Sequence, residues 1–157
     1  MKKLLFLLAS LILVAPASAQ TAAQPPARPA QKQKKEKGRP DTDLEKAMDK
    51  MGGAFRKLRQ QAKEGKFGPD AAEHVAKMQA AAAEAKKLEP LKAKEIPAAD
   101  RAKFTADFRE KLDEFSTALD GFAAALKAGD QAVAMQQFEK IGKLQRSDHE
   151  KFQPKDY

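Results

Sequence analysis

The chain of 157 residues contains no cysteine and no tryptophan, and its only histidines are His74 and His149. The absence of cysteine excludes a disulfide framework, a thiol nucleophile, a cysteine-ligated metal site and a cofactor attached through thioether bonds. β-Branched residues are few, whereas Ala, Lys, Glu, Leu and Gln are abundant, which argues against a sheet protein. Any imidazole chemistry must therefore use one of two residues in a helical protein.

The first 19 residues have the layout of a bacterial export signal. Residues 1–3 are basic, residues 4–14 form an apolar run, and residues 17–19 fit the A-x-A cleavage pattern. The apolar run is too short to span a bilayer, which requires about 20 such residues. We expect cleavage after Ala19 and a periplasmic protein without stable membrane insertion.

Residues 20–41 are rich in Pro, Gln, Ala and Lys, a composition that buries too little apolar surface to offset the entropy of ordering. We predict a flexible tether here and a folded domain over residues 42–157. The export signal and the tether carry most of the net charge of +8, so the domain is almost neutral. A basic tether can touch a membrane surface or an acidic partner, but a solvated spacer is the simpler interpretation. An exported protein is not expected to bind nucleic acid.

The domain divides into four segments with helical periodicity. The first begins with the capping-box spacing Thr42-x-x-Glu45 and carries an apolar seam with the spacing of a helix bundle. Because short connections make successive helices antiparallel, we predict an all-α, up-down-up-down four-helix bundle. The four segments are about residues 43–62, 69–89, 98–128 and 131–153.

This topology brings the starts of the first and third helices to the same end as the finish of the fourth. Met48 and His149 then meet at that end of the core, and Phe104 and Phe108 arrive at a similar depth, whereas His74 lies at the opposite end. A methionine and a histidine that face each other across a bundle are a known axial pair for haem iron. Equally, Met48 can be ordinary core packing, and His149 can be a polar residue that suits the helix dipole.

Three glycines lie inside predicted helices, where each costs about 1 kcal/mol relative to alanine. Gly52 and Gly53 follow Met48 by one turn, and Gly142 lies two turns before His149. These glycines would leave room for a flat macrocycle between the first and fourth helices. A close contact between two helices would explain them equally well.

The sequence DLEKAM at residues 43–48 resembles the opening of cytochrome b562, the periplasmic b-type haem protein family. The sequence KMxAAA at residues 77–82 is similar to the second helix of that family, and Phe104 and Phe108 resemble its haem-packing phenylalanines. His149 falls where the family has its histidine ligand. The resemblance implies that Met48 and His149 are the axial ligands of noncovalent haem b and that Phe104 and Phe108 pack against it.

Two positions depart from related patterns. The cytochromes c′ attach haem through C-x-x-C-H, whereas residues 145–149 here read QRSDH, with the histidine kept and both thiols absent. The haem-side arginine of the cytochrome b562 family is Gln145 here, which leaves Arg146 and Lys151 as candidate partners for the haem propionates.

The resemblance implies a periplasmic electron-transfer protein rather than an enzyme, with an unidentified redox partner protein. One alternative is a haem-free bundle of the same family that binds a partner or a metal ion. Another is five-coordinate haem, held by His149 alone, that binds a gas or reacts with peroxide. An apolar strip exposed on the third helix would favour a homodimer.

Overall fold

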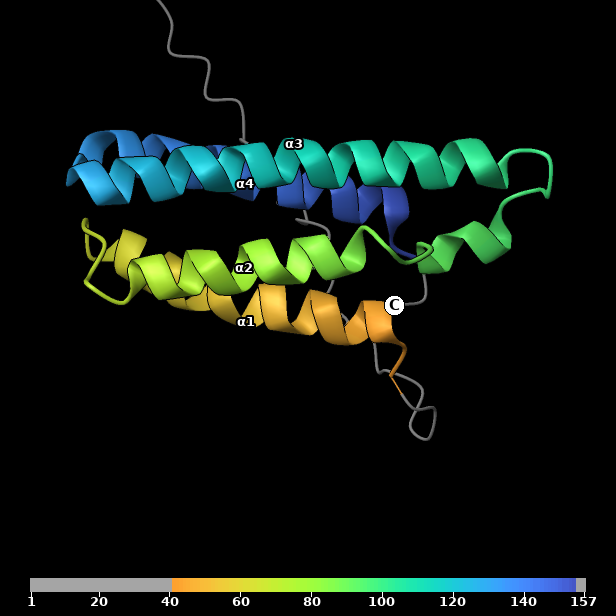
Figure 1. Ribbon diagram of the computed structural model, residues 1–157, viewed down its shortest axis with the longest axis horizontal. Coiled ribbons are helices and arrows are strands. Elements are labelled where there is room, and N and C mark those ends of the chain that lie inside the picture. The colour runs from red at the N-terminus through yellow and green to blue at the C-terminus, as the bar shows by residue number, and fades with distance from the viewer. Residues whose placement is uncertain (1–40, 155–157) are drawn as a thin grey trace, which may run out of the picture. The chain divides into compact units, whose positions relative to one another are not determined.

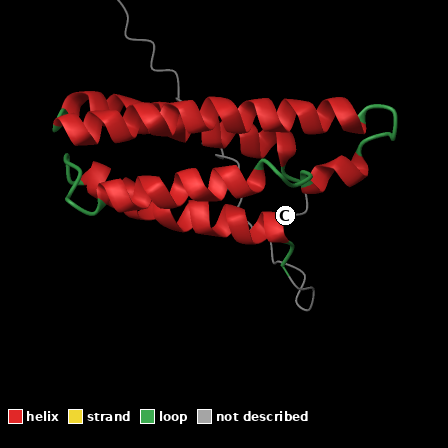
Figure 2. Cartoon of the chain, in the orientation of Figure 1, coloured by secondary structure: helices red, strands yellow, loops and turns green. Residues whose placement is uncertain are grey.

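The computed structural model describes residues 41–154. The predicted export signal, the predicted tether up to residue 40 and residues 155–157 lie outside the described residues. Within residues 41–154 the chain forms helices and no strand (Figure 2), which confirms the predicted all-α class. The helices are α1 (Asp43–Lys63), α2 (Ala71–Ala85), the 3-10 helix η1 (Leu91–Glu95), α3 (Arg101–Ala128) and α4 (Gln131–Phe152).

Local capping interactions fix the start of α1 and the turn between α3 and α4. The backbone N–H of Glu45 donates to Thr42 Oγ1 (3.2 Å), and the backbone N–H of Thr42 donates to Glu45 Oε2 (2.7 Å). Gly129 ends α3 with a φ of 71°, and Asp130 Oδ1 accepts from the N–H of Val133 (2.9 Å) at the start of α4. The capping box and the turn are therefore as the sequence predicts.

The second helix is shorter than predicted at both ends. It begins at Ala71, and the Asp70 side chain before it makes no capping hydrogen bond but accepts one from Gln61 Nε2 (2.8 Å). It ends at Ala85, and part of the predicted loop that follows forms η1. Pro90 is buried at the start of η1 and accepts a hydrogen bond from the N–H of Ala93 (2.8 Å). Residues 90–97 have no apolar period, so the sequence did not predict η1.

Helices that follow one another in the chain lie antiparallel and side by side (Figure 1). α1 packs against α2, α2 against α3, and α3 against α4. The starts of α1 and α3 and the finish of α4 share one end of the bundle, on the right in Figure 1, as predicted. By contrast, the backbones of α1 and α4 hardly approach each other.

The far end of the bundle is closed by an aromatic side chain from the α1–α2 loop. The ring of Phe67 is buried and packs edge-on against Phe122 (centroids 4.8 Å apart) and Phe138 (5.6 Å). The Gln131 amide holds the backbone of this loop, because Phe67 N–H donates to Gln131 Oε1 (2.8 Å) and Gln131 Nε2 donates to the Phe67 carbonyl (3.3 Å). A smaller buried cluster occupies the other end. Its members are Leu44, Ala47, Ala85, Phe108, Leu112 and Phe152.

Few large hydrophobic side chains are exposed on the surface of residues 41–154. None of the helices in this range has both the length and the hydropathy needed to cross a bilayer. Val133 on α4 is the one large hydrophobic side chain exposed in the described part of the chain. The homodimer expected from an apolar strip on the third helix stays a prediction.

Candidate functional site

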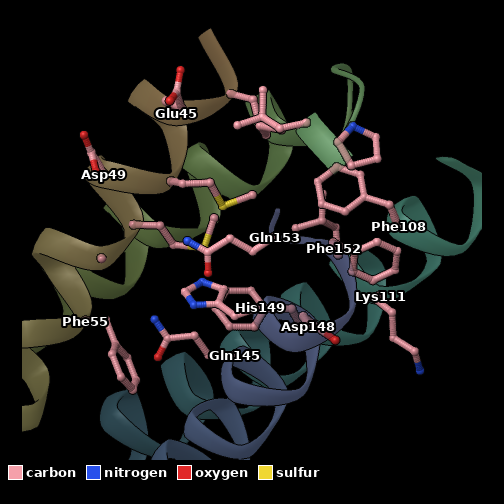
Figure 3. Close-up of a pocket in the computed structure, with 18 of the residues that line it drawn as sticks. Glu45, Asp49, Phe55, Phe108, Lys111, Gln145, Asp148, His149, Phe152 and Gln153 are labelled. Atoms are coloured by element: carbon pink, nitrogen blue, oxygen red, sulfur yellow. The ribbon is translucent and has the colours of Figure 1, made fainter. Parts of the chain in front are cut away.

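A cavity of about 410 Å³ lies at the end of the bundle where α1 begins and α4 ends (Figure 3). It forms where α1 and α4 hardly approach each other, and α3 together with Pro90 and Leu91 completes its walls. Small-molecule sites typically have volumes of about 300–1,000 Å³ and mostly apolar walls. The larger apolar side chains of the lining are Leu44, Met48, Met51, Phe55, Leu91, Phe108, Leu112, Phe115 and Phe152.

Met48 and His149 reach this cavity from opposite walls, on α1 and α4 respectively. Figure 3 shows the His149 ring pointing into the space below α1, with Gln145 and Asp148 on the same helix. The His149 residue keeps contact with solvent, yet partial burial lowers the pKa of its imidazole below the usual 6.5. The imidazole is therefore mostly neutral at pH 7, and the neutral form is the one that binds a metal ion.

A second thioether also lines the cavity. Met51 lies one helical turn from Met48, but its side chain is buried in the main core cluster, whereas Met48 is half-buried between the two core clusters. The Met48 side chain is therefore less tightly packed in the core than the Met51 side chain.

The two phenylalanines predicted for the site occupy different positions. Phe108 is buried and lines the cavity, whereas Phe104 is not among the lining residues. Both rings contact Phe152, at centroid distances of 5.3 Å from Phe108 and 5.1 Å from Phe104. Phe152 itself lines the cavity, so Phe104 supports the wall from behind.

The three glycines inside helices also differ in their position relative to the cavity. Gly52 lines the cavity, and Gly53 does not. A Cβ added to Gly142 would lie 3.6 Å from Cζ of Phe55, which is an ordinary van der Waals distance, so Gly142 faces this ring and not the cavity. The Phe55 ring also stacks on Phe138 (5.0 Å) and separates the cavity from the main core. Gly52 thus fits the prediction of open space, whereas Gly142 lies neither at the cavity nor at a close contact between the backbones of α1 and α4.

The α3–α4 side of the cavity carries one acidic and one basic side chain, Asp148 and Lys111. Burial raises the pKa of Asp148, and the nearby Lys111 ammonium partly opposes this rise. Lys111 itself pairs with Glu114, with 2.6 Å between Nζ and Oε1. This pairing neutralises the lysine on that wall.

The arginines of the cavity are on α1 and were not predicted from the sequence. Arg56 and Arg59 line the cavity. Arg146 and Lys151, the candidates named from the sequence, are not among the lining residues, and Lys151 Nζ pairs with Asp107 Oδ2 (3.1 Å). The step of four residues from Met48 through Gly52 to Arg56 was the available signal, because residues at this step share one face of a helix.

His74 lies at the start of α2, at the end of the bundle away from the cavity, as predicted. Its Nε2 is 3.3 Å from Asp70 Oδ2, and its buried Nδ1 has no hydrogen-bond partner within the described residues. In the same part of the chain, no three acidic, histidine or cysteine side chains cluster as a metal-ion site.

The fold and the cavity together define a class: a four-helix bundle with a methionine and a histidine facing one largely apolar cavity at one end. The family model of cytochrome b562 matches residues 43–153, which cover all four helices. The chain therefore belongs to the cytochrome b562 family, whose members are haem-binding electron-transfer bundles. A search of curated proteins found no match, and a search of solved structures found none either.

Proposed function

We propose that this protein is a periplasmic electron carrier that binds haem b noncovalently, with Met48 and His149 as the axial ligands. The observation that supports the proposal is one cavity, with mostly apolar walls, that receives a thioether from α1 and an imidazole from α4. Haem bound there would supply a one-electron iron centre, and methionine ligation would raise its reduction potential.

The residues of the cavity suit this role in three ways. The lowered pKa of His149 keeps a nitrogen lone pair available at neutral pH. The rings of Phe108 and Phe152 offer flat apolar walls and limit the access of water, which tunes the potential of a buried metal. Two ligands from the chain would leave no open iron position for a substrate, so we expect electron transfer to a redox partner protein rather than catalysis.

Export to the periplasm is part of the proposal. It is supported by the basic, apolar and A-x-A segments within residues 1–19, which are typical of a cleaved signal. The family alternative, a haem-free bundle that holds a metal ion, has less support, because residues 41–154 contain no cluster of three metal-ligating side chains.

An absorbance titration of the purified protein with hemin tests the proposal. We expect a saturable one-to-one complex with sharp reduced α and β bands, as for low-spin six-coordinate iron. His149→Ala should abolish tight binding. His74→Ala is the matched control, because it removes the other histidine at the opposite end of the bundle and should leave the complex unchanged.

Three results would count against the proposal. The broad band of loosely associated hemin would indicate a bundle that has kept the fold and lost the cofactor. A high-spin spectrum without added ligand would indicate five-coordinate haem held by His149 alone. Equal hemin binding by both histidine variants would show that the iron ligand is a residue other than His149.

A further inference from the structure

The α1 wall of the cavity carries two positive charges that the proposed iron ligation does not use. Arg56 and Arg59 line the cavity. Within residues 41–154, neither guanidinium takes part in an ion pair or a side-chain hydrogen bond. The cavity therefore has basic groups at its rim that no carboxylate of the described bundle neutralises.

Both arginine side chains are held close to the helix surface. The Cζ atom of Arg59 lies 4.7 Å from the centroid of the Phe55 ring, which is a cation–π contact with another lining residue. Arg56 folds back over the preceding turn, because a Cβ added to Gly52 or Gly53 would lie 3.9 Å from its Nη1 or Nη2. Its guanidinium therefore lies near the turn that follows Met48.

The other basic groups near the cavity already have partners or face elsewhere. Lys111 lines the cavity but pairs with Glu114. On α1, the carboxylates of Glu45 and Asp49 point away from the His149 ring in Figure 3. The two arginines are thus the cations of the lining that can accept a new acidic partner.

Two guanidinium groups at the rim of an apolar cavity suit a flat apolar ligand with carboxylates on its edge, since the guanidinium fork matches a carboxylate. Building on the proposed function, we propose that Arg56 and Arg59 donate hydrogen bonds to the propionate carboxylates of bound haem. These contacts would fix which edge of the haem faces the α1 rim.

The test compares two probes that differ only in the carboxylates: hemin and its dimethyl ester. The variant is Arg56→Gln with Arg59→Gln, and the control is Lys57→Gln with Lys140→Gln. The control removes the same charge from residues that do not line the cavity. We expect the variant to bind hemin about tenfold more weakly, equal to about 1.4 kcal/mol, and to bind the ester as tightly as the unchanged protein does. The salt dependence of hemin affinity should also decrease in the variant.

The outcomes separate this inference from the proposed function. Equal hemin affinity in the variant and the control would overturn the role of the arginines while leaving a low-spin complex intact. An equal loss for hemin and the ester would also overturn it, because the arginines would then act through packing. Failure of the unchanged protein to form the low-spin complex would overturn both proposals. Circular dichroism of each variant verifies that the helices are retained.

Discussion

Gly52 and Gly53 are neighbours in α1 that contact the same side chain and differ in one respect. A Cβ added to either glycine would lie 3.9 Å from a guanidinium nitrogen of Arg56, but only Gly52 lines the cavity. Replacing each glycine should therefore change stability equally and haem binding unequally. This pair tests whether the cavity is a ligand site without touching either proposed iron ligand.

The expected stability change follows from helix propensity. Glycine inside a helix costs about 1 kcal/mol relative to alanine, and neither new methyl group meets an atom closer than ordinary van der Waals contact. Gly52→Ala and Gly53→Ala should each raise the free energy of unfolding by about 1 kcal/mol. For a domain of this size that raises Tm by about 3–5 °C.

The expected binding change requires a larger side chain. A leucine at position 52 enters the cavity one turn from Met48, and overfilling a packed site costs about 1–3 kcal/mol. Gly52→Leu should therefore bind hemin about 5- to 160-fold more weakly than Gly53→Leu does, because both leucines meet the Arg56 side chain and only the one at position 52 enters the cavity. Both leucine variants gain helix propensity, so lost binding at position 52 cannot be attributed to unfolding.

Denaturant melts followed by circular dichroism measure the stability of the haem-free protein, and absorbance titrations measure hemin affinity. Equal hemin affinity of Gly52→Leu and Gly53→Leu would refute the reasoning, because the wall at Gly52 would then face no ligand. A destabilised Gly52→Ala would show instead that this wall is already tightly packed.

Three further predictions address the ligands and the opposite end. Met48→Leu should convert low-spin hemin to a high-spin form. Met51→Leu removes the other thioether of the cavity and should leave the hemin low-spin. Absorbance spectra of the two variants distinguish the spin states. Hemin affinity should be nearly constant above pH 6.5 and should fall as the pH decreases through the lowered pKa of His149, because protonation removes the lone pair that binds iron. Hemin titrations across this pH range measure the affinity, and an unchanged affinity at low pH would contradict the prediction. Gln131→Ala should lower the free energy of unfolding by about 1–2 kcal/mol through the loss of two hydrogen bonds to Phe67, without changing hemin affinity.

The predictable parts of the fold depend on local chemistry. The capping box at Thr42 and the turn at Gly129 use residues within one turn of each other, so their sequence spacing alone specifies them. The approach of Met48 and His149 to a shared cavity is long-range, but it follows from helix lengths and antiparallel topology. The start of α2 and helix η1 depend on particular tertiary contacts, which the sequence does not display.

The arginines and Gly142 show why the rest of the site could not be predicted. A charged residue beside an apolar seam is ordinarily solvated, and only the separation of α1 from α4 turns Arg56 and Arg59 into lining residues. Gly142 allowed two explanations, and neither holds, because Gly142 faces the Phe55 ring outside the cavity and the backbones of α1 and α4 hardly approach each other. In both cases the missing information was the distance between two helices that are far apart in the sequence.

The cores at the two ends of the bundle are filled to different extents. At the far end, Phe67 enters from a loop and fills the core, and Gln131 fixes its backbone. At the end that holds His149, Pro90 and Leu91 of the α2–α3 connection line a cavity and do not fill it, and α1 carries Gly52 where a larger side chain would fill the space. Protein cores are normally packed closely, and unfilled apolar volume is destabilising. A chain that closes one end with its own phenylalanine and leaves a cavity between a thioether and an imidazole at the other has the features expected if a ligand completes the second core.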